Sequence, residues 1–215
     1  MLNFSYCNPT RIIFGAGQIA QFGKQVPAGA TVLMLYGGGS IKHNGVYAQV
    51  TSALAGRRVL EFGGIEPNPG YETLMDAVAL ARAEKVDYLL AVGGGSVIDA
   101  SKFVAAAVPF AGEPWDILAK RAPIESALPL GCVLTLPATG SESNNGAVIT
   151  RKATQDKLSF LNDKVQPLFA ILDPRVTLSL PPKQVSNGVV DAFVHVVEQY
   201  LTYPVDARQP MPVGG

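Results

Sequence analysis

The chain has 215 residues, and its 17 Lys and Arg balance 17 Asp and Glu to a formal charge of zero. This balance gives no electrostatic reason to expect nucleic acid or an acidic membrane surface as a partner. Hydrophobic residues make up 48% of the sequence, but no apolar run reaches the roughly 18 residues of a membrane span, and the N-terminus shows no signal peptide.

Apolar, strand-like runs alternate with amphipathic or Ala-rich segments over most of the chain. The expected strands are residues 11–14, 31–36, 58–62, 87–92, 132–136 and 169–172. The expected helices are residues 18–25, 41–55, 71–84 and 97–108. Strands rich in Val, Leu and Ile with helices between them predict an α/β fold, in which a parallel sheet is covered on both faces.

The last third of the chain departs from this alternation. Residues 147–150 and 157–161 are expected to form a hairpin added to the main sheet. Pro174, Pro181 and Pro182 then mark a boundary, after which residues 183–202 are expected to form one long helix. We therefore expect a nucleotide-binding α/β domain over residues 1–178 and the start of a helical domain over residues 179–215.

The most informative local motif is a Gly-Gly-Gly-Ser sequence that closes two of the expected strands. Gly37–Ser40 follows residues 31–36, and Gly93–Ser96 follows residues 87–92. Glycine lets backbone N–H groups approach an anion closely, and the start of the following helix presents unpaired donors and a partial positive charge. Two such turns in one sheet favour a dinucleotide over a mononucleotide.

The second of these turns has two readings. In one, a pyrophosphate lies on the N–H groups of Gly94, Gly95 and Ser96, with Ser96 capping the helix and Asp99 facing the cofactor. In the other, Ser96 and Asp99 form a capping box that needs no ligand. Three consecutive glycines weaken the purely structural reading, because each costs backbone entropy.

The first turn lacks the Asp or Glu that binds the ribose hydroxyls of NAD. Ser40 and Lys42 stand there instead, and a hydroxyl with an ammonium suits the extra 2′-phosphate of NADP. Alternatively, Lys42 is a solvated helix residue. A third glycine motif, Gly15–Ala20, fits G-x-G-x-x-A, but its strand is short and no acidic residue ends the following strand, so we interpret it as a structural turn.

Two further patterns have both a functional and a structural reading. Thr135–Asn144 gathers hydroxyl groups after a buried strand, where they could line the nicotinamide–ribose side of a cleft or form a polar loop. Asp191 and His195 lie four residues apart on the last helix, a spacing that suits two ligands of one metal ion or a plain surface pair. A catalytic zinc site uses three protein ligands plus an open position, so the chain supplies at most half of a convincing site.

Together with Glu66–Pro69 and Leu172–Pro174, these motifs resemble the iron-containing (group III) alcohol dehydrogenases. The most similar branch is that of the NADPH-dependent aldehyde reductases and butanol dehydrogenases. The resemblance runs from Phe4 to about Arg208. It implies a Rossmann-like domain followed by an all-helical domain, in a dehydroquinate synthase-like architecture with the active site between the two.

The resemblance also implies roles for individual residues. Asp191 and His195 would be the first two ligands of an iron or zinc ion. The residues implied for NADP(H) are Gly38, Gly39 and Ser40 at the adenosine 2′-phosphate, Asn68 near the adenine nucleotide, Gly94, Gly95, Ser96 and Asp99 at the pyrophosphate and toward the nicotinamide, and Thr135, Thr139, Ser141 and Lys157 at the ribose and phosphates.

The C-terminus departs from this family. The family takes two further histidines from its helical domain, but no histidine follows His195, and from Gln209 the sequence leaves the family pattern. We therefore expect a truncated NADP(H)- and metal-dependent enzyme with impaired activity on short-chain aldehydes and alcohols.

Two alternatives stay open: a non-catalytic NADP-binding fragment or interaction module, and an enzyme similar to glycerol dehydrogenase. The uncovered apolar face of the last helix predicts association, most simply as a homodimer. Cys7 and Cys132 do not suggest a disulfide framework, which favours a reducing cytoplasm.

Overall fold

The computed structural model describes residue 3 and residues 5–201. The chain separates into two units, of which the larger is Asn8–Ser179. The other holds the segment that begins at Leu180, together with the N-terminal residues up to Cys7.

The larger unit is built on one sheet of parallel strands in the order β1-β8-β5-β4-β2-β3. The strands are β1 Arg11–Phe14, β2 Thr31–Tyr36, β3 Arg58–Phe62, β4 Tyr88–Gly93, β5 Leu130–Leu134 and β8 Phe169–Leu172. The predicted parallel sheet is confirmed. Its main deviation is that β5 begins and ends two residues before the predicted range.

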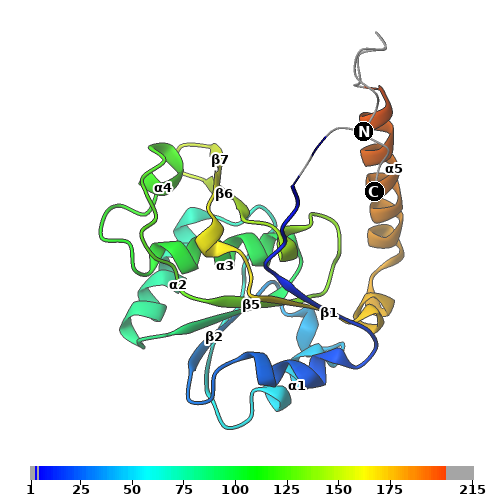
Figure 1. Cartoon of the computed structure of the whole chain (residues 1–215), viewed down its shortest axis with the longest axis horizontal. Helices are drawn as coiled ribbons and strands as arrows, with labels where there is room; N and C mark the ends of the chain where they lie inside the picture. Colours follow the sequence, from blue (N-terminus) through cyan, green and yellow to red (C-terminus); the bar gives the residue numbers. More distant parts are fainter. Residues whose placement is uncertain (1–2, 4, 202–215) are drawn as a thin grey trace. The chain divides into compact units, whose positions relative to one another are not determined.

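Helices cover both faces of this sheet (Figure 1). On one face lie α2 (Tyr71–Ala83) and α3 (Gly95–Ala107), and on the other lie α1 (Val46–Ala53) and the 3₁₀ helix η1 (Gln18–Gln25). Successive side chains of a strand point to opposite faces. In β2, Leu33 and Leu35 therefore enter the core under α2 and α3, whereas Val32 and Met34 enter the core under α1.

Two predicted helices differ from the observed elements. The range 41–55 is divided into a short 3₁₀ helix, η2 (Ser40–Lys42), and α1. Gly45 interrupts it with a φ of 81°, a left-handed conformation that a helix cannot include. The range 18–25 forms the 3₁₀ helix η1.

The predicted hairpin forms, but its predicted place was wrong. Strands β6 (Gly146–Arg151) and β7 (Asp156–Leu161) pair with each other in a separate antiparallel sheet. Ala147, Ile149 and Phe160 are buried in the same core as α3, because one face of the hairpin is apolar. The hairpin therefore packs by its side chains on a helix and does not extend the main sheet.

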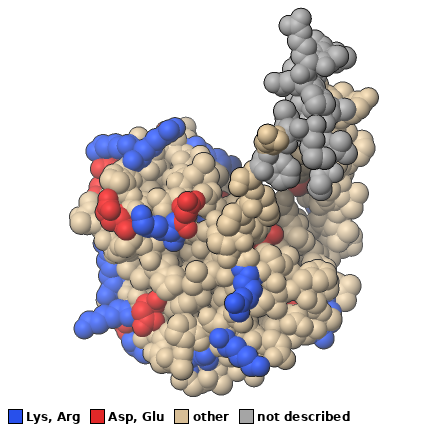
Figure 2. Space-filling view, in the orientation of Figure 1, with Lys and Arg blue, Asp and Glu red and all other residues tan. Residues whose placement is uncertain are grey.

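Short elements complete the larger unit. They are α4 Asp116–Ala119, η3 Ser141–Ser143, η4 Asp163–Val165 and η5 Pro174–Ser179. Basic and acidic side chains lie interspersed on the face drawn in Figure 2. Partly exposed ion pairs, such as Lys152–Glu66, join some of the charged side chains of this unit.

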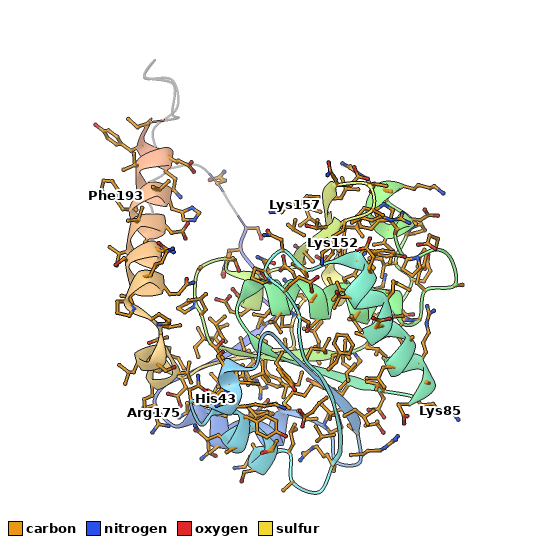
Figure 3. All side chains as sticks on the ribbon, turned by 180° about the vertical axis from the view of Figure 1, so that it is seen from behind. His43, Lys85, Lys152, Lys157, Arg175 and Phe193 are labelled. Atoms are coloured by element: carbon orange, nitrogen blue, oxygen red, sulfur yellow. The ribbon has the colours of Figure 1, made fainter. Side chains whose placement is uncertain are left out.

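The second unit contains the predicted long helix, α5 (Pro182–Leu201). Val189, Phe193 and Tyr200 on this helix are about two-thirds exposed (Phe193 is labelled in Figure 3). Within residue 3 and residues 5–201, no helix is long and apolar enough to cross a membrane. The predicted helix end at Thr202 and the departure from the family pattern from Gln209 onward lie outside the described residues.

Candidate functional site

The two glycine triplets lie at the ends of two neighbouring strands, at the point where the order of the strands changes direction across the sheet. β2 and β4 pair in parallel, with Tyr36 opposite Val92. From this pair the sheet continues to β3 on one side and to β5 on the other. In open α/β sheets, ligands bind in the crevice outside the carboxyl ends of the strands at such a switch point. The tertiary structure thus brings both triplets to the edge where a dinucleotide is expected.

The loop after β5 lies against the second triplet. A Cβ atom at Gly95 would lie only 2.3 Å from Thr139 Oγ1, and the Thr135 N–H donates to the Gly93 carbonyl at 3.0 Å. Any larger residue at Gly95 would push this loop away. Three predicted site residues, Gly95, Thr135 and Thr139, therefore come together at the start of α3.

The start of α3 corrects one prediction. The helix begins at Gly95, and its N-cap residue is Gly94, with no side-chain cap. Ser96 is therefore the second residue of the helix and does not cap it, and the capping box with Asp99 does not form. The first N–H groups of the helix thus have no side-chain partner from a cap, which is the condition for anion binding at a helix start.

The Asp99 carboxylate is occupied by two donors from the loop after β5 and from the hairpin. Asp99 Oδ1 accepts the Ser141 hydroxyl at 2.5 Å, and Oδ2 accepts the Val148 N–H at 2.9 Å. Ser141 is almost fully buried. Both residues therefore fix the position of the loop relative to α3, and their predicted contacts with a cofactor remain predictions.

A buried lysine that sequence reasoning missed completes this network. Lys102 on α3 is fully buried, and its ammonium donates to three oxygen atoms. The acceptors are Ser141 Oγ at 3.0 Å, Asn144 Oδ1 at 2.7 Å and the Gly146 carbonyl at 2.8 Å. Because an ammonium only donates and a carboxylate only accepts, Ser141 accepts from Lys102 and donates to Asp99. Its sequence signal was a lysine three residues after Asp99 in an otherwise apolar, Ala-rich helix.

Burial shifts both charged groups of this network toward their neutral forms. Burial lowers the pKa of Lys102 to about 8, against the opposing effect of the Asp99 charge. Burial also raises the pKa of Asp99, and the hydrogen bonds from Ser141 and Val148 only partly offset it. Each shift has desolvation as its largest cause.

A cavity of about 280 Å³ opens beside this network. Its wall includes the predicted site residues Asp99, Thr139 and Ser141, together with Phe160 and Leu161 of the hairpin. A pocket with a few polar groups and apolar walls is typical of a small-molecule site. The hairpin thus contributes to the same edge of the unit as the glycine triplets.

The first triplet contains a glycine that the fold itself does not require. A Cβ atom at Gly38 would meet nothing within 4 Å, and Gly38 is not among the residues with positive φ. Gly39, by contrast, has a φ of 92° and needs glycine for its backbone conformation. Open space in front of Gly38 fits a loop that a ligand approaches closely.

Asn68 and Lys157 also meet, although 89 residues separate them in sequence. Lys157 Nζ donates to Asn68 Oδ1 at 2.8 Å. Lys157 belongs to β7, and Figure 3 shows it near Lys152 at one end of the unit. Asn68 follows Gly64, whose N–H donates to the Gly37 carbonyl at 3.0 Å. The loop after β3 therefore links the first triplet to the hairpin.

The third glycine motif has a structural partner. The Gly17 N–H donates to the buried carboxylate of Asp173 at 2.6 Å, and Gly17 adopts a φ of 79°. Arg175 also donates to Asp173. The hydrogen bonds from Arg175 and Gly17 outweigh desolvation and lower the pKa of Asp173. These contacts support the interpretation of Gly15–Ala20 as a structural turn.

The candidate metal ligands lie on α5. Asp191 Oδ2 and His195 Nε2 are 3.6 Å apart, and the side chains are 50% and 65% exposed. Carboxylate and imidazole are suitable donors for iron or zinc. In the part of the chain that the structure describes, however, no group of three or more His, Cys, Asp or Glu could hold a metal. The two donors therefore fit a divalent metal in type, and they are two where a catalytic site normally uses three.

Comparisons with known proteins identify the family of this chain. A family model described as iron-containing alcohol dehydrogenase matches residues 9–174. The NADPH-dependent aldehyde reductase YqhD of Escherichia coli K12 is 62% identical over 211 residues, which are 97% of this chain and 54% of that protein.

Solved structures of relatives have the same fold. The E. coli YqhD crystal structure matches with a TM-score of 0.88 and 62% identity, over 95% of this chain and 53% of that chain. The NADH-dependent butanol dehydrogenase A of Thermotoga maritima matches with a TM-score of 0.87 and 44% identity, over 93% and 51% of the two chains. This chain spans about half the length of the curated relatives it matches. It belongs to the iron-containing alcohol dehydrogenase family.

Proposed function

We propose that this chain binds NADP(H) at the carboxyl edge of β2 and β4, as the nucleotide-binding part of a metal-dependent aldehyde reductase or alcohol dehydrogenase. The observation that carries this proposal is the open space in front of Gly38. This glycine follows β2, which pairs with β4 at the point where the strand order continues to opposite sides of the sheet. Neither packing nor backbone conformation explains a glycine there, whereas the close approach of a phosphate does.

The proposed coenzyme contacts come from four segments of the Asn8–Ser179 unit. They are Gly38, Gly39 and Ser40 after β2, Asn68 after β3, Gly94, Gly95, Ser96 and Asp99 at the start of α3, and Thr135, Thr139, Ser141 and Lys157 from the loop after β5 and the hairpin. We place the boundary of the nucleotide-binding domain at residue 178 and the start of a helical metal-binding domain at residue 179.

When bound, a nicotinamide coenzyme supplies hydride to a carbonyl carbon, and a divalent metal polarises the carbonyl oxygen. The chain's own residues bind and orient. The N–H groups at the start of α3 hold negative charge, and the Lys102 network fixes the loop after β5 against that helix. Asp191 and His195 would hold the metal.

The chain by itself is expected to reduce aldehydes poorly. Two ligands leave a divalent metal without the third protein ligand that catalytic sites normally use. The proposed substrates are short-chain aldehydes and alcohols. The two free cysteines support a reducing cytoplasm, and the exposed apolar side chains of α5 support association, most simply as a dimer.

A fluorescence titration with NADPH tests the nucleotide site. We expect the full chain to bind NADPH and the Gly38→Val variant to bind at least tenfold more weakly, because the added side chain fills the space proposed for the phosphate. Gly188→Val is the matched control, since a Cβ at Gly188 on α5 also meets nothing within 4 Å. Equal affinity in Gly38→Val and the unaltered chain, or no binding by the unaltered chain, would contradict the site.

An alternative function is a non-catalytic NADP-binding module, which the set of only two metal donors favours for this chain alone. Metal analysis and an aldehyde assay distinguish this module from the enzyme. Binding of NADPH with little metal and little turnover supports the module. Stoichiometric iron or zinc with rapid NADPH-dependent reduction of a short aldehyde would instead show that the chain needs no further ligands.

A further inference from the structure

A carboxylate from the neighbouring strand lies at the proposed adenosine end of the site. The strand β2 itself ends without an acidic residue, but Glu61 of β3 lies opposite Met34 of β2 in the parallel pair. Its carboxylate accepts the Tyr36 hydroxyl at 3.0 Å and the Tyr47 hydroxyl at 2.5 Å. The first glycine loop therefore has an acidic neighbour that the order of residues in the sequence does not reveal.

The same carboxylate pairs with the cation of this loop. Lys42 Nζ lies 3.3 Å from Glu61 Oε2 and 5.1 Å from the ring centres of both Tyr36 and Tyr47. The Lys42 N–H donates to the Gly39 carbonyl at 3.0 Å, so the lysine is anchored to the glycine triplet. Lys42 is thus engaged by a specific partner and is not simply a solvated helix residue.

The two tyrosines hold Glu61 in place whether or not Lys42 is bound to it. Tyr36 is buried, and its ring lies so close to Gly63 that a Cβ there would be 2.5 Å from it. Partial burial raises the pKa of Glu61, but the hydrogen bonds from Tyr47, Tyr36 and Lys42 outweigh it and lower the pKa below its usual value. Glu61 is therefore a fixed negative charge at neutral pH.

We propose that Glu61 sets the coenzyme preference of this site by competing with the 2′-phosphate of NADP(H) for Lys42. Because Lys42 Nζ lies 3.3 Å from Glu61 Oε2, a phosphate that reaches Lys42 must also come close to this carboxylate. The two negative charges then repel each other. NAD(H) brings ribose hydroxyls instead, and a carboxylate is the group that accepts them in NAD-dependent sites. Glu61 thus limits the preference for NADP(H) that the pairing of Ser40 with Lys42 predicts. This inference rests on the proposed nucleotide site.

The test is the ratio of the NADH and NADPH dissociation constants of the full chain, measured by fluorescence titration at low salt. Glu61→Gln removes the charge and keeps the shape, so we expect the ratio to rise about fivefold or more in favour of NADPH. Lys42→Met should lower the ratio, because NADPH loses its cation while NADH does not.

Glu84→Gln is the matched control. Glu84 is a similarly exposed carboxylate that pairs with Arg58 at the other end of β3, and its loss should leave the ratio unchanged. Thermal unfolding of each variant checks that the fold is intact. An unchanged or lowered ratio in Glu61→Gln, or an equal rise in Glu84→Gln, overturns the inference alone. If the unaltered chain binds neither coenzyme, the proposed function fails and the inference fails with it.

Discussion

Lys102 shows how one buried charge organises the edge of the sheet. Its ammonium links the loop after β5 to the hairpin, and through Ser141 it reaches Asp99. Burying an ammonium is costly unless it is paired and hydrogen-bonded, and all three of its protons are used here. The network therefore holds the loop in one position, at the cost of disfavouring the charged form of the lysine.

This cost predicts a pH effect on stability. Because the pKa of Lys102 is about 8 in the folded chain and 10.5 for an ordinary lysine, the unfolded chain binds more protons between these values. The Lys102 contribution to the free energy of unfolding therefore rises with pH in this window, by up to about 3 kcal/mol. In urea unfolding, the free energy of unfolding of the unaltered chain minus that of Lys102→Met should therefore rise from pH 8 to pH 10.

Lys120→Met serves as the control for that series. Lys120 is exposed and forms an ion pair with Asp116 one helical turn away. Because Lys120 is not buried, the difference in free energy of unfolding between the unaltered chain and Lys120→Met should lack the rise expected for Lys102→Met. If this difference stays constant or falls with pH for Lys102→Met, burial does not lower the pKa of Lys102 and the prediction is wrong.

At the scale of elements, the β6–β7 hairpin is attached to α3 by packing. Phe160 of β7 is 8% exposed and meets Phe103 of α3 with ring centres 6.5 Å apart at 70°. Edge-to-face aromatic pairs of this kind add to the stabilisation from apolar burial. Since the hairpin also carries Lys157 and the Val148 N–H, its attachment positions part of the proposed site.

Adjacent residues of β7 allow a matched test of this attachment. Phe160→Ala should lower the free energy of unfolding by about 3 kcal/mol or more, because it leaves a cavity under the hairpin. Leu161→Ala should change it by less than about 0.5 kcal/mol, since Leu161 points the other way and is 75% exposed. Urea unfolding measures both, and equal effects would show that Phe160 does not hold the hairpin on α3.

At the scale of the whole molecule, the proposed coenzyme belongs to the Asn8–Ser179 unit and should stabilise that unit. The single tryptophan, Trp115, is buried in this unit and reports its unfolding. At one hundred times its dissociation constant, NADP⁺ should raise the free energy of unfolding by about 2.7 kcal/mol. The oxidised coenzyme is used because it does not absorb the tryptophan emission.

Phe193→Ser on α5 is the control for this measurement. Phe193 is 68% exposed and belongs to the other unit. The variant should show the same gain from NADP⁺ as the unaltered chain. No gain in the unaltered chain at saturating NADP⁺ would contradict binding to the folded unit.

Local sequence patterns were sufficient for most of the sheet and for the two glycine-rich turns that follow β2 and β4. Apolar runs closed by glycine triplets identified β2 and β4, because a buried parallel strand needs continuous apolar residues and a sharp turn needs glycine. The order of motifs also predicted the family to which the chain belongs. The hairpin was correctly predicted as an element, but its predicted partner, the main sheet, was wrong, since an apolar face can pack on a helix or a sheet.

The contacts between distant segments were decided only by the tertiary structure. Glu61 joins the first glycine loop because β3 pairs with β2, and Lys102 meets Asn144 because the loop after β5 folds over α3. The residues next to Glu61 and Lys102 in the sequence do not indicate which residue each will contact. The sequence by itself determined which segments become strands, helices and tight turns, since these depend on neighbouring residues. Which charges meet at the edge of the sheet depends on strand order and register, and these are properties of the folded chain.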